Sequence, residues 1–252
     1  MTSPRTAFSQ VAPGVHRLTK ADVNCYLIAD GEGLSLVDTG LPAMWPDLVG
    51  LLGAVGATPA DIDAVLLTHG HFDHVGMSRR LIIEHGTAHH VHERDRHLAR
   101  HPYSYKPAAP RGLYPLRHPR AIPILARMVA AGALWVRGVD AAGDVVPGTP
   151  LEVPGLPVPV FSPGHTGGHC AFFLPEQGVL LSGDALVTLD PYTGETGPRI
   201  VANAATADAA EAVASLEALR ETEARVVAPG HGEPLVSGIE GAVHAAARAG
   251  VA

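Results

Sequence analysis

Four potential metal ligands are packed into a run of six residues, and they are His69, His71, Asp73 and His74. The run follows the apolar, strand-length segment Ala64-Val-Leu-Leu, so the ligands come at a turn where the curving backbone can bring them together. Imidazole nitrogens and carboxylate oxygens are ligands that zinc and related divalent ions take in proteins. The spacing therefore predicts a metal site immediately after a strand.

Three further segments repeat this setting later in the chain. Pro163-Gly-His165, Ser182-Gly-Asp184 and Pro229-Gly-His231 each place a glycine and a ligand-type residue after a short apolar run. Glycine allows a close backbone approach and turn geometry that a side chain would obstruct. We interpret the other histidines of the central region as solvated or packing residues: His89, His90, His92, His97, His101 and His118.

The number of ligands decides how many ions the site holds, because a catalytic zinc ion usually takes three protein ligands and a water molecule. Seven ligands are too many for one such ion: His69, His71, Asp73, His74, His165, Asp184 and His231. Two divalent ions fit if the Asp184 carboxylate is shared between them. No thiolate is needed, so the ligand types favour zinc, iron or manganese over soft-metal sites without choosing among them. Zinc is the metal we expect, with iron or manganese as the alternatives.

The rest of the chain supplies elements that position these ligands. Apolar runs of strand length predict β-strands at Gly14–Lys20, Asn24–Ala29, Leu34–Asp38, Ala64–Thr68, Val158–Ser162, Cys170–Leu174, Val179–Ser182 and Arg225–Ala228. Helices are predicted at Trp45–Val55, Ser78–Glu84 and Thr206–Arg220. In the last helix Thr206 is the expected N-cap, and the expected apolar face is Val213, Leu216 and Leu219. Strands and helices alternate, which predicts an α/β fold.

The sequence also contains a weak internal echo. Gly33-Leu-Ser-Leu-Val-Asp38 resembles Gly178-Val-Leu-Leu-Ser-Gly-Asp184, and Ala64-Val-Leu-Leu-Thr-His69 resembles Arg225-Val-Val-Ala-Pro-Gly-His231. Each segment leads an apolar strand into an Asp or a His. Two similar half-sheets that deliver polar residues from their strand ends would place those residues along one shared edge, where we expect the chemistry.

These motifs resemble the metallo-β-lactamase superfamily, whose His-x-His-x-Asp-His motif is matched by residues 69–74, and the resemblance spans nearly the whole chain. It implies an αββα sandwich of two mixed β-sheets flanked by helices, in a single domain over residues 1–252. It also implies how the ligands divide between two ions: His69, His71 and His165 on the first, Asp73, His74 and His231 on the second, and Asp184 on both.

The same resemblance implies roles around the ligands. Asp38, in Val-Asp-Thr-Gly, matches an aspartate of the family that helps to orient the metal loop. Two cations about 3.5–4 Å apart lower the pKa of a bridging water and polarise a substrate oxygen, so hydrolysis by a metal-bridging hydroxide is the expected reaction. Asp73 is expected to orient that hydroxide and Asp184 to bridge the ions, which makes both catalytic. His169 and Cys170 begin the next predicted strand and are assigned to structure.

Composition narrows the possible partners. Of the 252 residues, 46% are hydrophobic and 17% are charged, a balance typical of a globular protein. The formal net charge of -7 argues against binding to nucleic acid. The polar first ten residues lack a secretory signal, and apolar runs are too short to span a membrane, so we expect a cytoplasmic protein with a small-molecule substrate and no membrane contact. Cys25 and Cys170 are expected to be buried thiols, and the sequence leaves the oligomeric state open.

A long segment, residues 94–140, lies between the first ligands and His165 and is rich in Pro, Arg and His. Its composition predicts loops and short helices. Its aromatic residues are Tyr103, Tyr105, Tyr114 and Trp135. Both of its ends are anchored near the expected metal edge, so the segment is either a lid that carries substrate-binding residues or an ordinary surface excursion.

Departures from relatives of known activity narrow the substrate. Few residues follow His231, too few for the glutathione-binding region of glyoxalase II enzymes. Acyl-homoserine lactonases carry a tyrosine three residues after the bridging Asp, where this chain has Val187, and Tyr192 is off that register. We therefore expect a hydrolase of a small thioester, ester or lactone. The alternative is a persulfide dioxygenase of the same fold, which uses a single iron ion and molecular oxygen.

Overall fold

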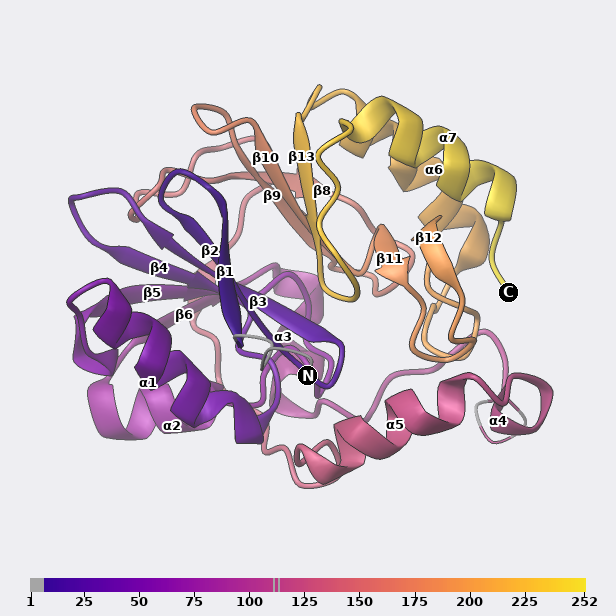
Figure 1. The fold of residues 1–252 in the computed structure, drawn as a ribbon, viewed down its shortest axis with the longest axis horizontal. Coiled ribbons are helices and arrows are strands. Elements are labelled where there is room, and N and C mark those ends of the chain that lie inside the picture. Colours follow the sequence, from indigo (N-terminus) through magenta and orange to yellow (C-terminus); the bar gives the residue numbers. More distant parts are fainter. Residues whose placement is uncertain (1–6, 111, 113) are drawn as a thin grey trace, which may run out of the picture.

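Two β-sheets pack face to face between two layers of helices in the computed structural model, which describes residues 7–110, 112 and 114–252 (Figure 1). The first sheet has its strands in chain order: β1 (Phe8–Ala12), β2 (Val15–Lys20), β3 (Val23–Ala29), β4 (Leu34–Val37), β5 (Ile62–Leu66), β6 (Ala88–Val91) and β7 (Gly143–Asp144). Strands β1 to β4 pair antiparallel and β4 to β7 pair parallel, so the sheet is mixed.

The second sheet has the strand order β13–β10–β9–β8. Its members are β8 (Val158–Phe161), β9 (Cys170–Leu174), β10 (Val179–Gly183) and β13 (Val226–Pro229). Strands β10 and β13 are parallel, and the other neighbours are antiparallel. A separate antiparallel pair, β11 (Val187–Leu189) and β12 (Thr196–Arg199), follows β10.

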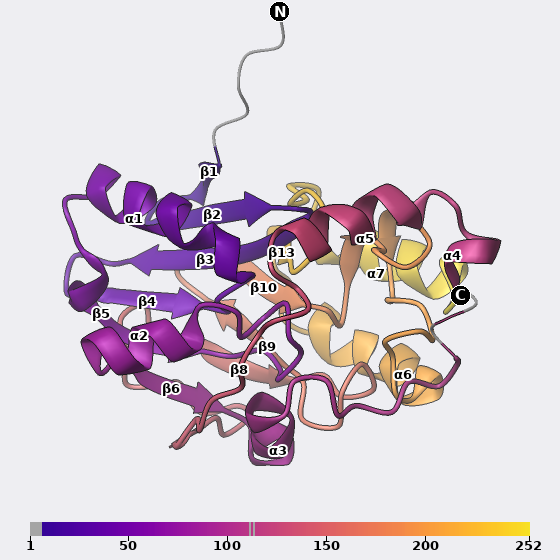
Figure 2. The same ribbon diagram turned by 90° about the horizontal axis from the view of Figure 1, so that it is seen from below.

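Helices cover the outer face of each sheet (Figure 1 and Figure 2). Helices α1 (Trp45–Ala54) and α2 (Ser78–His85) lie on the first sheet, and α6 (Ala209–Arg220) and α7 (Ile239–Ala249) lie on the second. The connection from β6 to β7 contains α3 (Arg96–Arg100), α4 (Tyr114–Arg117) and α5 (Ala121–Ala130). Short 3-10 turns occur at Pro42–Met44, Pro59–Asp61 and Glu93–Asp95.

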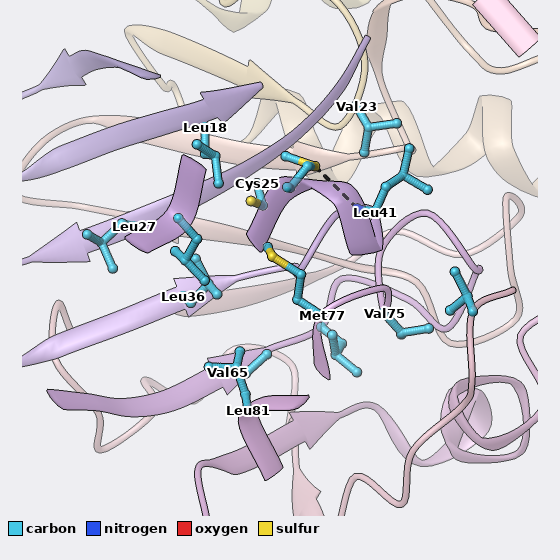
Figure 3. Close-up of a cluster of buried hydrophobic side chains, with 14 of the residues drawn as sticks. Leu18, Val23, Cys25, Leu27, Leu36, Leu41, Val65, Val75, Met77 and Leu81 are labelled. Atoms are coloured by element: carbon cyan, nitrogen blue, oxygen red, sulfur yellow. Dashed lines mark hydrogen bonds between the residues drawn. The ribbon is translucent and has the colours of Figure 1, made fainter. Parts of the chain in front are cut away.

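Alternation along β3 shows how the layers are held together. Leu27 is buried on the helix side of the sheet, where it joins Leu36, Val65 and Leu81 in the cluster drawn in Figure 3. Its neighbour Ile28 is buried on the other side, against second-sheet residues such as Phe172. Because both faces of the sheet are covered, its central strands need apolar residues at successive positions, and they read as continuous apolar runs. The predicted αββα sandwich is confirmed.

The predicted helix at residues 206–220 is correct in type but wrong at its start. Helix α6 begins at Ala209, and its N-cap is Asp208, whose side chain accepts a hydrogen bond from the Glu211 backbone N–H. Thr206 is buried before the helix, and its hydroxyl donates to the Val201 carbonyl instead. The predicted apolar face is also wrong at Val213, which is 41% exposed, whereas Leu216 and Leu219 are buried as expected.

The helices α3, α4 and α5 agree with the short-helix character expected of the 94–140 segment. The elements that were not predicted from the sequence are β1, β6, β7, β11, β12 and α7. Strands β7 and β11 have only two and three residues, too few for a periodic pattern. Both cysteines are buried free thiols, as predicted. Among the residues that the structure describes, none of the helices has the length and apolar character needed to cross a membrane.

Candidate metal centre

The predicted ligands all follow the carboxyl ends of strands that meet at one edge of the sandwich. Asp38 and His69 come after β4 and β5, which pair in parallel, and Asp184 and His231 come after β10 and β13, which also pair in parallel. Parallel neighbours end at the same edge of a sheet. The internal echo therefore corresponds to two parallel strand pairs, one in each sheet, and the expected shared edge is present.

The ligand side chains converge in a buried cluster, where each of three groups has its ligand atoms within 4.8 Å of one another. The groups are His69, His71 and His165; His69, His74 and Asp184; and Asp73, His74 and His231. The first and third match the expected division between two ions. Asp184 lies between them, with Oδ2 3.4 Å from His165 Nε2 and 3.3 Å from His231 Nε2.

Asp38 and Thr68 determine which nitrogen of the first histidines is protonated. The Thr68 hydroxyl donates to Asp38 Oδ2 at 2.8 Å and lies 3.0 Å from His69 Nδ1. Because its single proton points to Asp38, the hydroxyl accepts from His69 Nδ1–H, which leaves the Nε2 lone pair available. His74 Nδ1 lies 2.8 Å from Asp38 Oδ2 and donates to it, with the same result. Asp38 thus contacts the metal loop in the way its expected role requires.

The protonated ring nitrogens of His231 and His165 are fixed in the same way by other hydrogen-bond partners. His231 Nδ1 lies 2.8 Å from the Asp22 carbonyl, which can only accept a hydrogen bond. His165 Nδ1 lies 3.5 Å from the Thr206 hydroxyl, whose proton goes to Val201. Sequence reasoning missed both supports, because a carbonyl carries no residue signature and Thr206 was taken for a helix cap.

Unpartnered nitrogen and oxygen atoms show that the cluster fits metal ions. Within the described part of the chain, buried atoms without a hydrogen-bond partner include Nε2 of His69, His74 and His231 and Oδ1 of Asp184. Burying a polar atom without a partner is costly, and such atoms rarely occur together in a folded protein. Imidazole and carboxylate donors that face one another are the ligand types that zinc, iron and manganese accept.

Burial and mutual charge separate the pKa values of the histidines. Burial lowers the pKa of His165 to about 4, and burial together with neighbouring imidazoles holds that of His69 well below its usual value. Burial also acts to lower the pKa of His231, but the carboxylates of Asp184 and Asp73 raise it to about 10. Burial acts to raise the pKa of Asp184, but His231 and His74 hold it well below the usual range. Imidazolium–carboxylate pairs therefore balance the buried charge when no ion is bound.

His169, which the sequence analysis assigned to structure, supports the Asp184 backbone. Its Nε2 accepts the Asp184 backbone N–H at 3.1 Å, and its Nδ1 lies 2.9 Å from the Ser162 hydroxyl. Burial lowers the pKa of His169 to about 3, so the ring is neutral and its Nε2 acts as an acceptor. Its neighbour Cys170 is the first residue of β9 and packs between the sheets.

The four aromatic residues of the 94–140 segment lie in different surroundings. The Tyr105 ring packs on His71 with ring centroids 3.9 Å apart, and its hydroxyl lies 3.4 Å from that of Tyr192. Tyr103 stacks on Phe72 within the metal loop. Tyr114 is buried and donates to the Ala252 carbonyl, whereas Trp135 is 71% exposed. Of these residues, Tyr105 contacts a predicted ligand.

This chain matches the metallo-beta-lactamase superfamily in sequence. The superfamily model covers residues 18–231, a range that includes Asp38 and all the predicted ligands. The chain therefore belongs to the metallo-β-lactamase superfamily. The fold, the His and Asp cluster and the relatives below identify it as a metal-dependent hydrolase.

Relatives include proteins with and without an assigned substrate. The probable metallo-hydrolase YflN of Bacillus subtilis is 27% identical over 93% of this chain and 90% of its own length. The N-acyl homoserine lactonase AttM of Azorhizobium caulinodans is 31% identical over 80% of this chain and 70% of its own. A solved structure, TTHA1623 in a di-iron-bound form, superposes with a TM-score of 0.62 at 26% identity, over 89% of this chain and 95% of that one.

We predict that Asp184→Asn lowers metal occupancy more than Asp38→Asn does. The first change removes a negative charge that lies between both groups of ligands, whereas the second mainly disturbs the orientation of His69 and His74. Elemental analysis of desalted protein should show stoichiometry falling towards one ion for Asp184→Asn. Two tightly retained ions in that variant would show that the bridging role is wrong.

Zn²⁺ binding at pH 7 should release protons. A pKa of about 10 keeps His231 protonated at pH 7 in the metal-free protein, and the ring must become neutral to bind an ion. Because the pKa is raised, the apparent affinity should increase with pH, by up to about tenfold per pH unit for each proton displaced. Calorimetry in buffers of different ionisation enthalpy measures the protons released. His231→Ala should release fewer than the control His244→Ala, which changes an exposed histidine of α7, and equal release would contradict the prediction.

Proposed function

We propose that the protein is a dinuclear hydrolase of a small thioester, ester or lactone. The observation that carries this proposal is the pair of ligand groups, His69 with His71 and His165, and Asp73 with His74 and His231, on either side of Asp184. Seven buried ligand residues in one cluster exceed the three protein ligands that a catalytic zinc ion usually takes. Zinc is the proposed metal, and the di-iron form of TTHA1623 makes iron the principal competitor.

When bound, two divalent ions supply an activated water and polarise the substrate carbonyl oxygen. The contribution of the chain is to hold the reacting groups in place. Asp73 Oδ2 lies 3.4 Å from His231 Nε2, so the Asp73 carboxylate belongs to the ligand cluster. Its proposed role is to orient the attacking water by accepting a hydrogen bond from it. Asp184 keeps negative charge between the two ligand groups and is held by the His169 ring behind it.

Two partly exposed tyrosines beside the metal centre support the choice of substrate class. Tyr105 and Tyr192 pack against a buried cluster of Val187, Val201 and Ala205, which holds their rings in place. The Tyr105 ring reaches the centre through its contact with His71. Aromatic rings with phenolic hydroxyls suit an acyl chain or ring that carries a polar carbonyl group. AttM, a lactonase by name, supports the inclusion of lactones among the candidates.

We expect purified protein to contain two zinc ions per chain and to hydrolyse members of a panel of thioesters, lactones and simple esters without consuming oxygen. His71→Ala should reduce kcat/KM to near background while the fold persists, because the apolar core and the other ligands remain. The matched control is His97→Ala, which changes an exposed histidine of α3. Near-wild-type hydrolysis by metal-quantified His71→Ala would remove His71 from the site.

Oxygen uptake with a persulfide substrate, together with a single iron ion per chain, would favour the dioxygenase alternative. The metal content and the oxygen electrode therefore separate the two activities in one preparation. Hydrolysis that requires only one bound ion would contradict the dinuclear part of the proposal and leave the hydrolase class intact.

The 94–140 segment is proposed to select the substrate, through Tyr105 in particular. Deleting the segment would remove buried core residues such as Ile124 and Met128, so a single substitution is the better test. Tyr105→Ala should change the relative kcat/KM values across the substrate panel while two ions stay bound. Trp135→Ala is the control within the same segment, because Trp135 is 71% exposed. An unchanged order of substrates in folded, fully loaded Tyr105→Ala protein would refute the lid.

A further inference from the structure

Asp95 is a buried carboxylate that sequence reasoning did not single out. It ends the 3-10 turn after β6 and stands at the N-cap position of α3, with 1% of its surface exposed. An aspartate at this position commonly caps its own helix. Here the described residues show no such side-chain cap, and the carboxylate points to two loops that carry predicted ligands.

Three hydrogen bonds connect Asp95 to those loops. Oδ2 accepts the Gly70 backbone N–H at 2.9 Å and the Thr166 hydroxyl at 2.9 Å, and Oδ1 accepts the Gly168 backbone N–H at 2.8 Å. Gly70 lies between His69 and His71, and Thr166 follows His165 directly. The carboxylate therefore joins two loops that are adjacent only in space.

The two glycines allow this connection because a side chain at either position would collide with the turn. A Cβ on Gly70 would lie 2.4 Å from the Ala99 backbone nitrogen, and a Cβ on Gly168 would lie 2.7 Å from the Asp95 backbone nitrogen. Real Cβ atoms do not approach this closely. The two loops are thus packed closely against α3 and the turn that precedes it, with no space for a side chain at either glycine.

We propose that Asp95 is a positioning residue that sets the spacing of His71 and His165 and thereby the affinity of the first metal site. The inference rests on the metal centre of the proposed function. His165 Nε2 lies 3.0 Å from His71 Nδ1, so small shifts of either loop change the distance between two ligand atoms. Supports of this kind typically change metal affinity by about 10–100-fold when they are removed.

The same contacts extend to the shared carboxylate. Gly168, held by Asp95, precedes His169, whose Nε2 accepts the Asp184 backbone N–H. The connection from Gly70 through Asp95 and His169 to Asp184 thus includes three of the loops that carry ligands. The second group, with Asp73, His74 and His231, is supported separately by Asp38 and the Asp22 carbonyl. Loss of Asp95 should therefore affect one ion more than the other.

The substitution that isolates this role is Asp95→Asn, which keeps the size of the side chain. An ionised carboxylate accepts on both oxygens, whereas a carboxamide presents an NH₂ group on one side. Whichever way the amide turns, this NH₂ faces a buried backbone N–H, of Gly70 or of Gly168, and one donor loses its partner.

The test is a Co²⁺ titration of metal-free protein, followed by visible absorption, which reports ligand geometry, and by competition with a chelator. Asp95→Asn should weaken one of the two Co²⁺ ions about 10–100-fold and shift its absorption bands, while the other changes much less. The matched control is Asp30→Asn, since Asp30 also accepts three backbone N–H bonds, from Glu32, Gly33 and Gly155. Asp30 precedes β4, whereas the metal centre lies beyond the other end of that strand. This control should leave both affinities and the spectrum unchanged.

A purely structural role would lower the thermal midpoint of Asp95→Asn without altering the Co²⁺ spectrum or either affinity, and this result would overturn the proposal. If Asp95→Asn does not fold, Thr166→Val is the second variant, because it removes the hydrogen bond from the Thr166 hydroxyl to Asp95 and should still shift the Co²⁺ spectrum. Thr166→Ser keeps the hydroxyl and should show the wild-type spectrum. An unshifted spectrum in Thr166→Val would then overturn the proposal. Wild-type protein that binds no Co²⁺ would instead overturn the metal centre on which both proposals rest.

Discussion

The carboxylate of Asp38 is the interaction on which the orientation of His69 and His74, one ligand in each expected group, depends. It accepts the backbone N–H and the hydroxyl of Thr68 and the ring N–H of His74. Through the Thr68 hydroxyl it also determines the tautomer of His69. Asp38 adopts a φ of 59°, a left-handed conformation that costs a residue other than glycine on the order of 1 kcal/mol or more. Such a conformation persists because the surrounding hydrogen bonds over-determine it.

Ligand identity was predictable from sequence because each ligand follows a local signal. An apolar strand, a turn with glycine and then His or Asp is visible within a few residues, as at His69 and His231. The supports of these ligands were not predictable in the same way. Asp22 lies 209 residues from His231, whose ring it holds with a carbonyl that every residue possesses. Asp95 was missed because its partners Gly70, Thr166 and Gly168 lie 25, 71 and 73 residues away in the sequence. Val213 was misplaced because helical periodicity alone does not show how wide a face of a helix its neighbours cover.

Electrostatics explains why the ligand cluster binds ions and why burying it without an ion costs free energy of folding. Several buried imidazole nitrogens face one another, and burial deprives them of water. Protons on His74 and His231 balance the charges of Asp73, Asp184 and Asp38 when no ion is present. A divalent ion supplies the same positive charge and also satisfies the lone pairs that a proton leaves unpaired. The arrangement of the donors therefore favours an ion over protons wherever the metal is available.

The two parallel strand pairs have a consequence for the mechanics of the whole chain. Each sheet contributes part of the ligand set, so neither half of the polypeptide holds all the candidate ligands by itself. His71 and His165 are 94 residues apart in sequence and face each other across the interface between the sheets. A bound ion thus cross-links distant segments as a disulfide would, closing long loops that are entropically costly to form. Unlike a disulfide, such a cross-link forms and breaks without a redox reaction, and the stability that it adds to the folded chain rises with the free metal concentration.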